Sequence, residues 1–321
     1  MNAIEISVVM SVFNEQESLD KTMLSILNQQ GVNFELIVVD DGSSDDTAKI
    51  LAGYAAKDDR VIVLSQSNQG ITQALVNGCK QAKGDLIARQ DAGDWSLARR
   101  LKTQADIFNR YPDVVLCSTG ARYFSERGEL LFEASLSAEE ARLGLEAKSL
   151  ESLKGPSHHG CSMFRRDAYE KCGGYRTEFF VAQDLDLWTR LVSLGKHVAI
   201  ADIYYEAILR KNAISSKQRE RQEITRQHIF ECCQLRKQIG NDTQHIGQLK
   251  QKVSQLLSNK TNSSLDYNYF VGSILLKPKP KQSRYYFKEV LKLKPWHFKC
   301  WIKLLSSYLL LPKRSDSGIS F

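Results

Sequence analysis

Two carboxylates, Asp91 and Asp94, stand three residues apart shortly after the apolar run 86–88. Such a run predicts a buried strand, so the two side chains should lie in the turn at its end. Carboxylate oxygens at this spacing suit a hard divalent cation such as Mg²⁺ or Mn²⁺. Such a cation lets a negatively charged diphosphate bind beside carboxylates that would otherwise repel it. The pair therefore indicates a metal–diphosphate site, although an Asp-rich turn is also typical of an ordinary loop.

Two further polar segments follow predicted strands in the first half of the chain. The apolar runs 4–10 and 34–39 predict buried strands, and the polar segments 11–15 and 40–44 come directly after them. Predicted strands alternate with amphipathic helices up to residue 111, which indicates a parallel sheet with right-handed crossovers. Ligands of such sheets bind beyond the carboxyl ends of the strands. The three polar segments are therefore expected to meet in one site.

The alternation of strands and helices breaks after residue 114. A hairpin is predicted around 126–128, a helix over 137–154, a strand at 161–164 and a helix over 185–194. The hairpin makes a mixed sheet the expected architecture. A helical region over 215–257 and a helical hairpin over 265–312 are predicted to follow.

Charge is distributed unevenly along the chain. Residues 210–321 contain 22 Lys and Arg against 7 Asp and Glu, whereas residues 1–209 contain 22 against 30. This asymmetry predicts two modules, 1–209 and 210–321, with different partners. Basic residues beside apolar helices suit an anionic membrane surface. A hairpin that packs on the first module with solvated lysines, and a tetratricopeptide-like unit for a protein partner, are the alternatives. No recognition motif accompanies the charge, so nucleic acid is not an expected partner.

The composition is that of a globular protein, with 42% apolar and 25% charged residues. No apolar run approaches the roughly 20 residues that span a bilayer, and the first 14 residues do not resemble a signal peptide. The seven cysteines are scattered without paired spacing, which favours reduced thiols. We expect a cytoplasmic protein, peripheral on the inner face of the cell membrane.

Five blocks of this chain occur in an order that resembles one family, the inverting glycosyltransferases of family 2. The blocks cover residues 7–15, 35–47, 68–70, 91–94 and 183–188. The resemblance implies an α/β fold of the GT-A type, a mixed sheet flanked by helices, here with a basic, mainly helical C-terminal extension. It also implies a nucleotide-diphospho-sugar donor.

By this resemblance, five residues would bind the nucleotide-sugar: Ser11, Phe13, Glu15, Asp41 and Gly70. The ring of Phe13 would stack on the base, and Asp41 would accept a hydrogen bond from an N–H of the base. Most relatives have Pro at position 11 and Tyr at position 13, so stacking is kept while a hydroxyl is lost. A core aromatic at Phe13 and a turn-former or helix cap at Asp41 are the structural alternatives.

The resemblance assigns Asp91 to the donor ribose or the metal and Asp94 to the metal, Mg²⁺ or Mn²⁺. Relatives usually carry a third carboxylate between these two positions, commonly the direct metal ligand, where this chain has Gly93. Asp94 would then ligate the cation in its place. His158 and His159 precede a predicted strand, where a histidine would bind a metal, orient the acceptor or serve as an ordinary loop histidine.

Asp184 matches the catalytic base of the family. An inverting transfer needs one carboxylate to take the proton of the acceptor hydroxyl on the face opposite the departing nucleotide. Relatives have Glu before this Asp, whereas this chain has Gln183, and the lost negative charge is expected to lower the pKa of Asp184. Both Asp184 and Asp186 could instead be carboxylates favoured by a helix N-terminus, and Asp186 is expected to be structural.

These assignments predict the transfer of a sugar to a hydroxyl of a glycan or lipid-linked acceptor, in bacterial cell-surface polysaccharide synthesis. A catalytically degenerate nucleotide-sugar-binding scaffold is the alternative, because Gly93 and Gln183 both alter the catalytic centres. A nucleotidyltransferase is less consistent with the sequence, since segment 11–15 lacks the Gly-rich basic loop that holds a triphosphate.

Overall fold

A mixed sheet built around four parallel strands organises the protein. The computed structural model describes residues 4–211, 219–243, 245–248 and 263–310. The strands are β1 (Ile6–Val12), β2 (Phe34–Asp40), β3 (Val61–Ser65), β4 (Leu86–Asp91), β5 (Trp95–Ser96), β6 (Val114–Ser125), β7 (Leu130–Ala134), β8 (Ser162–Arg165) and β9 (Lys196–Leu209). Their order is β3-β2-β1-β4-β8-β6-β9-β5, with β7 paired to β6. The pairs among β1 to β4 are parallel, whereas β8 runs antiparallel to β4. The prediction of a mixed sheet is confirmed.

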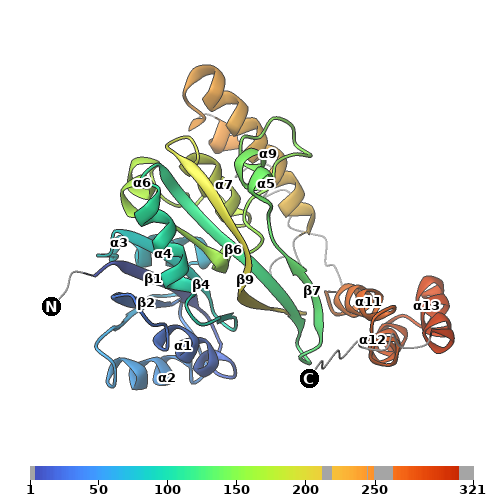
Figure 1. Ribbon diagram of the computed structural model, residues 1–321. Helices are drawn as coiled ribbons and strands as arrows, with labels where there is room; N and C mark the ends of the chain where they lie inside the picture. The colour runs from blue at the N-terminus through green and yellow to red at the C-terminus, as the bar shows by residue number, and fades with distance from the viewer. Residues whose placement is uncertain (1–3, 212–218, 244, 249–262, 311–321) are drawn as a thin grey trace, which may run out of the picture. The chain divides into compact units, whose positions relative to one another are not determined.

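Helices cover both faces of this sheet (Figure 1). One layer contains α1 (Leu19–Leu27), α2 (Thr47–Ala55) and α4 (Arg100–Arg110), and the other contains α3 (Ile71–Lys80), α6 (Arg166–Lys171) and α7 (Gln183–Leu191). Alternate residues of a strand point to opposite faces. Val8 therefore packs in the cluster of the first layer, while Val9 packs with Leu75 and Trp188 in that of the second.

The segment 137–154 forms a shorter helix than the sequence predicts. Helix α5 (Ala138–Gly144) starts with a capping box, in which Ser137 and Glu140 exchange hydrogen bonds. It ends at Gly144, where a β-carbon would collide with the backbone of Lys154, and the Lys154 N–H donates to the Gly144 carbonyl over 2.9 Å. The prediction of a helix up to residue 154 is wrong. The close approach of Gly144 to Lys154 ends the helix, and the periodicity of the sequence does not reveal such a contact.

The chain divides into two compact units. The first contains residues 1–123, 133–208 and 220–257, and the second contains 124–132, 209–219 and 258–321. This division differs from the predicted boundary at 209/210, since most of α9 (Arg219–Ile239) belongs to the first unit. Ile229 and Cys232 of α9 pack with Leu153 and Phe179 of that unit. The positive charge of this region did not reveal that its helix has a buried apolar face.

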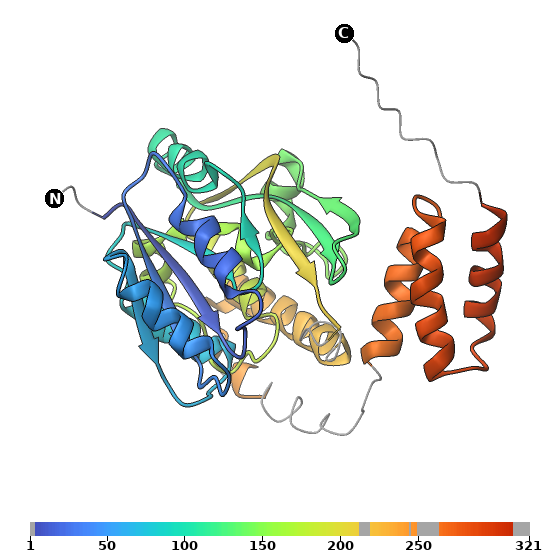
Figure 2. The ribbon, with the colours of Figure 1, turned by 90° about the horizontal axis from the view of Figure 1, so that it is seen from below.

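Three helices dominate the second unit, where the sequence predicts a hairpin of two. They are α11 (Ser263–Leu275), α12 (Pro280–Leu293) and α13 (Phe298–Leu309), which lie side by side (Figure 2). The tip of the β6–β7 hairpin packs with them, because Leu131 joins the apolar cluster of Tyr267 and Val271. The hydroxyl of Tyr286 donates to Glu129 over 2.7 Å. Among the described residues, no helix is both long enough and apolar enough to cross a membrane.

Candidate active site

The register of the parallel strands brings the predicted polar segments together. Ser11 on β1 pairs with Asp91 on β4 and, on its other side, with Val39 on β2. The N–H of Asp41 donates to the Val12 carbonyl over 2.9 Å. The segments that follow β1, β2 and β4 therefore meet at one edge of the sheet, as predicted.

A fully buried arginine holds Asp91. Arg89 has no exposed surface, and its Nη2 lies 2.7 Å from Asp91 Oδ1. Burial raises the pKa of Asp91, but the charge of Arg89 opposes burial, and the pKa lies below its ordinary value. Asp91 is therefore ionised at neutral pH.

The turn after Asp91 explains both Gly93 and the position of Asp94. Gly93 has a φ of +87°, which glycine adopts without steric cost, and its N–H donates to Thr22 Oγ1 over 3.0 Å. Asp94 is 6% exposed. Its Oδ2 accepts a hydrogen bond from the Tyr205 hydroxyl over 3.1 Å, and its Oδ1 accepts one from the Ile208 N–H over 2.9 Å. The Asp94 carboxylate is thus fixed in orientation beside Asp91.

His158 lies between the two carboxylates. Its Nδ1 is 3.7 Å from Asp91 Oδ2 and its Nε2 is 3.6 Å from Asp94 Oδ2. Burial lowers the pKa of His158, so the ring is neutral at neutral pH. Nδ1 accepts a hydrogen bond from the Gly160 N–H over 3.1 Å, which places the proton of the neutral ring on Nε2.

This group of donor atoms fits a divalent cation. Asp91, Asp94 and His158 each offer one ligand atom within 4.8 Å of the others. Carboxylate oxygens suit both Mg²⁺ and Mn²⁺, and an imidazole nitrogen is more compatible with Mn²⁺. His158 would ligate through Nε2 only by giving up the proton there, so the two carboxylates are the primary ligands of such a site.

Asp184 sits in the first turn of α7, where its Oδ1 accepts a hydrogen bond from the Leu185 N–H over 2.8 Å. Burial, and then the negative charge of Asp91, raise the pKa of Asp184 to about 6, although the Leu185 hydrogen bond opposes them. Burial therefore outweighs the decrease expected from Gln183. A carboxyl with this pKa is mostly ionised at pH 7 and still has appreciable proton affinity.

Asp186, on the same helix, differs from Asp184 in its partners. It is fully buried, and its Oδ2 lies 2.6 Å from Arg190 Nη2 and 3.5 Å from Arg176 Nε. A buried carboxylate between two guanidinium groups is a structural feature, in keeping with the expectation for Asp186.

Asp41 organises the loop that leads into α3. One carboxylate oxygen accepts hydrogen bonds from Gln66 Nε2 and the Gln69 N–H, both over 2.8 Å, and the other accepts one from the Gly70 N–H over 2.9 Å. Gly70 has a φ of +88° and precedes the first residue of α3. The protein therefore uses both oxygens of Asp41 to shape the loop, and its hydrogen bond to a base stays a prediction.

The side chains that follow β1 have different surroundings. Phe13 is 48% exposed, so the alternative of a core aromatic is wrong, and its ring is accessible to a planar ligand. Glu15 accepts a hydrogen bond from the Ser18 hydroxyl over 2.6 Å, and its N–H donates to Thr47 Oγ1 over 2.9 Å. Ser11 is partly buried at the end of β1. Contact of these residues with a nucleotide stays a prediction.

Tyr205 belongs to the site but was missed in the sequence, whereas His159 was noted there together with His158. The Tyr205 ring stacks on His158 with centroids 5.1 Å apart, and its hydroxyl accepts a hydrogen bond from the Asp91 N–H over 3.1 Å. His159 Nε2 accepts from Arg89 Nε over 3.2 Å and lies 2.7 Å from the Tyr175 hydroxyl. Burial lowers the pKa of His159 to about 3. Tyr205 lies on β9, more than a hundred residues from Asp91, and no local pattern marks it.

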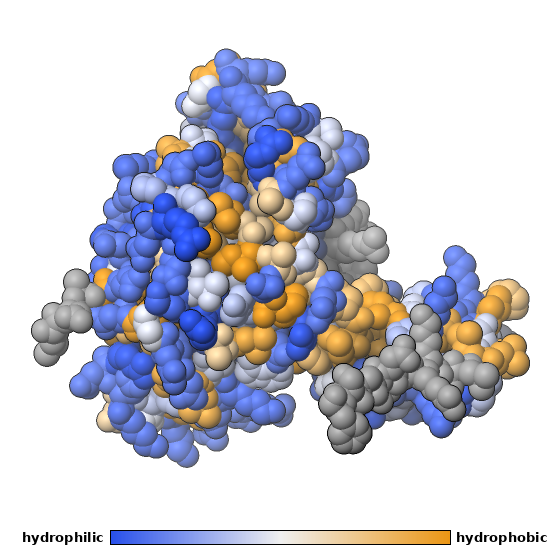
Figure 3. All heavy atoms as spheres, in the orientation of Figure 1, coloured by the Kyte–Doolittle hydropathy of each residue, from blue (hydrophilic) through white to orange (hydrophobic). Residues whose placement is uncertain are grey.

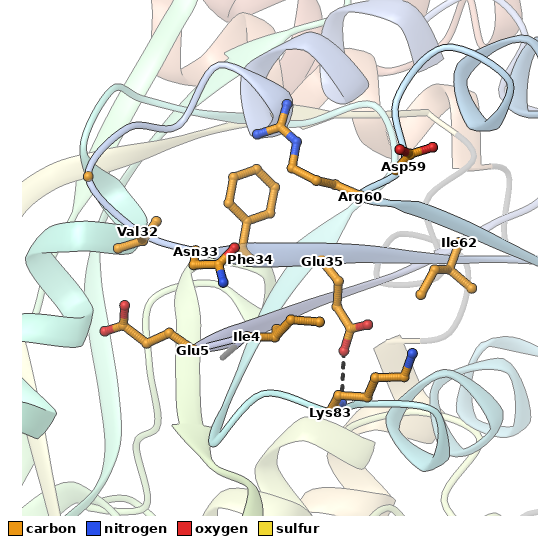
Figure 4. A pocket seen from close by; sticks show the side chains of 11 residues that line it. Ile4, Glu5, Val32, Asn33, Phe34, Glu35, Asp59, Arg60, Ile62 and Lys83 are labelled. Atoms are coloured by element: carbon orange, nitrogen blue, oxygen red, sulfur yellow. Dashed lines mark hydrogen bonds between the residues drawn. The ribbon is translucent and has the colours of Figure 1, made fainter. Parts of the chain in front are cut away.

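A hollow of about 1120 Å³ lies at the opposite ends of the same strands (Figure 4). Ile4 and Glu5 line it before β1, Asn33 before β2 and Lys83 before β4. Glu35 accepts a hydrogen bond from the Lys83 N–H over 2.8 Å there. This hollow is therefore separate from the carboxylate cluster, which occupies the carboxyl ends of the strands.

The fold is of the GT-A type. The structure resembles that of S. aureus TarS in complex with UDP, with a TM-score of 0.56 and 17% sequence identity over 95% of this chain and 89% of that one. The TarS structure in complex with UDP-GlcNAc gives a TM-score of 0.53, also at 17% identity. At this level of identity the likeness concerns the fold alone.

Sequence comparison identifies the family. The model of glycosyl transferase family 2 matches residues 7–173, and the chain belongs to this family. It is 33% identical over 195 residues to the putative glycosyltransferase EpsE of Bacillus subtilis, covering 60% of this chain and 68% of EpsE. It is 31% identical to the amylovoran biosynthesis glycosyltransferase AmsE of Erwinia amylovora (60% and 71%) and to the O-antigen biosynthesis glycosyltransferase WbnJ of Escherichia coli (59% and 72%). The protein is therefore a glycosyltransferase.

Proposed function

We propose that the protein transfers a sugar, with inversion, from a nucleotide-diphospho-sugar to a hydroxyl of a glycan or lipid-linked acceptor. The observation that carries this proposal is a pair of carboxylates whose pKa values are shifted in opposite directions. Asp91 has a pKa below the ordinary value of an aspartate, whereas the pKa of Asp184 is raised to about 6. Carboxyl groups whose environments separate their pKa values commonly divide into a charge-stabilising role and a proton-transfer role.

Asp184 takes the proton of the acceptor hydroxyl in this proposal. The hydroxyl oxygen forms a bond to the anomeric carbon of the donor while the bond from that carbon to the diphosphate oxygen breaks, and the nucleoside diphosphate leaves with the electron pair. Attack opposite the leaving group inverts the anomeric centre. One base carboxylate suffices for this chemistry, and burial, with a smaller contribution from the charge of Asp91, keeps the proton affinity of Asp184 high.

Asp91 and Asp94, with His158 beside them, would hold the Mg²⁺ or Mn²⁺ ion. A divalent cation supplies charge stabilisation for the departing diphosphate. Phe13 offers its exposed ring to the base, and Asp41 and Gly70 shape the loop on the β2 side of the site.

The biosynthetic setting is proposed from the relatives. AmsE and WbnJ are named for the biosynthesis of amylovoran and of O-antigen. We therefore place this protein in cell-surface polysaccharide synthesis, in the cytoplasm and peripheral on the inner face of the membrane.

A stripe on α13 provides the surface for membrane association. Its exposed members are spaced by three and four residues, as one face of a helix requires: Phe298, Trp301, Ile302, Leu305, Tyr308 and Leu309. Figure 3 shows hydrophobic side chains in this region, at its right-hand edge. Residues 277–303 contain nine Lys and Arg and a single acidic residue. Aromatic and aliphatic side chains beside lysines suit an anionic lipid surface.

Vesicle sedimentation tests this surface. Leu305→Ser should reduce the binding of the full chain to vesicles that contain phosphatidylglycerol. Leu24→Ser, which changes an exposed leucine of α1, should leave binding unchanged. Equal binding of the two variants, or equal binding to neutral and anionic vesicles, would contradict the assignment.

Titration calorimetry with UDP, GDP and dTDP, each with and without Mn²⁺, tests the donor site. We expect metal-dependent binding of one nucleotide that is weakened in Asp91→Ala. NMR of the transferred sugar should then show inversion at the anomeric carbon. Nucleotide binding without hydrolysis or transfer under any metal would favour the degenerate scaffold, for which Gly93 and Gln183 are the motivating residues.

A further inference from the structure

A second cluster of metal-ligating side chains lies on α9, outside the candidate active site. His228 and Cys232 are four residues apart and therefore face the same side of the helix. His245 comes from the segment that folds back after the helix, and one ligand atom from each of the three lies within 4.8 Å of the others. His228 is 2% exposed and Cys232 is fully buried.

The hydrogen bonds around the cluster orient both imidazole rings. His228 Nε2 lies 2.7 Å from the carbonyl oxygen of His245, and His245 Nε2 lies 2.7 Å from Glu231 Oε2. Because a carbonyl or carboxylate can only accept, each neutral ring carries its proton on Nε2 and its lone pair on Nδ1. Metal-bound histidines usually make this kind of hydrogen bond with the nitrogen that does not ligate.

The simpler interpretation is a stacked histidine pair inside a hydrogen-bonded cluster. The two rings are 4.0 Å apart and nearly parallel, with an angle of 8° between their planes. Stacking accounts for the rings and apolar packing with Ile229 for the burial of Cys232, but neither requires a thiol within 4.8 Å of both imidazoles. Two imidazole nitrogens and a thiolate are the ligand types of tetrahedral zinc sites rather than of Mg²⁺ sites.

We propose that His228, Cys232 and His245 bind a structural zinc ion. Glu231 orients His245 through the hydrogen bond to its Nε2, and a water from the hollow of about 200 Å³ that His228 and Glu231 line would complete the coordination. The ion is chemically distinct from the divalent cation of the Asp91–Asp94 cluster, because that cluster contains no sulfur.

The position of the cluster suggests what the ion would stabilise. It would tie the segment after α9 to the helix, and this segment carries Asp242. The Asp242 carboxylate accepts a hydrogen bond from Arg176 over 3.0 Å, and Arg176 also lies 3.5 Å from Asp186 on α7. The ion would thus support, through Asp242 and Arg176, the helix that presents Asp184. This inference does not depend on the proposed transfer reaction.

Metal analysis of the purified full chain tests the site, with elemental content measured after dialysis without chelator. Wild type should contain about one zinc per chain, as expected for a structural site. Cys232→Ser should lose the zinc. Cys233→Ser is the matched control, since Cys233 is the neighbouring buried cysteine and lies outside the cluster. Asp94→Asn should also keep the zinc, which separates this site from the catalytic cluster.

Cobalt substitution keeps the test decisive if Cys232→Ser fails to fold. Wild type reconstituted with Co²⁺ should show the near-ultraviolet band of a thiolate–cobalt bond, and so should Cys233→Ser. A wild-type chain without zinc and without this band overturns the proposal, as does zinc retained in Cys232→Ser.

Discussion

Replacement of Asp184 by Asn should strongly reduce activity and, at pH 7, make the protein more stable. The folded structure raises the pKa of Asp184 from 3.8 to about 6. The folded state therefore holds a proton on this group between roughly pH 4 and 6, where the unfolded chain has released it. Stability consequently falls as the pH rises through this window, and the ionised carboxylate destabilises the folded state at neutral pH.

The magnitude follows from the shift. About two pKa units correspond to about 2.7 kcal/mol, and since Asp184 is partly exposed we expect Asp184→Asn to gain about 1–2 kcal/mol at pH 7. At pH 4, where the wild-type carboxyl is already neutral in the folded state, the gain should vanish. If Asp184 is the base, turnover should fall by about 10²–10⁴-fold. Wild-type kcat/KM should decrease tenfold per pH unit below about pH 6.

Urea unfolding of both proteins at pH 4 and 7, together with the pH profile of sugar transfer, measures these quantities. Asp186→Asn is the matched control on the same helix. It leaves Arg190 and Arg176 without their buried carboxylate, so it should destabilise the fold by about 3–5 kcal/mol. The decrease of kcat/KM at low pH should remain in this variant. An Asp184→Asn variant that keeps most of its activity, or that is less stable than wild type at pH 7, would refute the reasoning.

Three further outcomes follow from the site. Asp94→Ala removes the acceptor of the Tyr205 hydroxyl and a primary metal ligand, so calorimetry should show Mn²⁺-dependent nucleotide binding weakened at least about tenfold. Gly93→Ala places a β-carbon at a φ of +87° and should cost about 1–2 kcal/mol in urea unfolding, whereas unchanged stability would mean that the turn relaxes freely. Arg89→Met leaves Asp91 without its buried partner, so thermal unfolding should show destabilisation by about 3–5 kcal/mol, and a neutral effect would contradict the role of that ion pair.

The parallel half of the sheet and the convergence of three polar segments could be predicted because both depend on local patterns. Apolar runs mark β1, β2 and β4, and the polar residues after them, such as Ser11 and Asp91, reach the same edge wherever strands run parallel. Tyr205 could not be predicted, since it reaches the site from β9, which is separated from β4 by β8 and β6 in the sheet. The same holds for Gly144, where a tertiary contact ends a helix whose periodicity continues.

Gly93 stands where relatives usually carry a metal-binding carboxylate, and the turn geometry changes how that departure is judged. The turn requires a φ of +87° at position 93, and the N–H of this residue is bonded to Thr22. Glycine adopts this conformation without the strain that a side chain would bring there. The neighbouring Asp94 carboxylate is buried and doubly hydrogen-bonded, and its ligand atom lies within 4.8 Å of those of Asp91 and His158. Two oriented carboxylates beside an imidazole remain a sufficient donor set for a divalent cation. The loss of a carboxylate at position 93 is therefore a weak argument for a scaffold, and the proposed inverting transfer depends on Asp184 as its base.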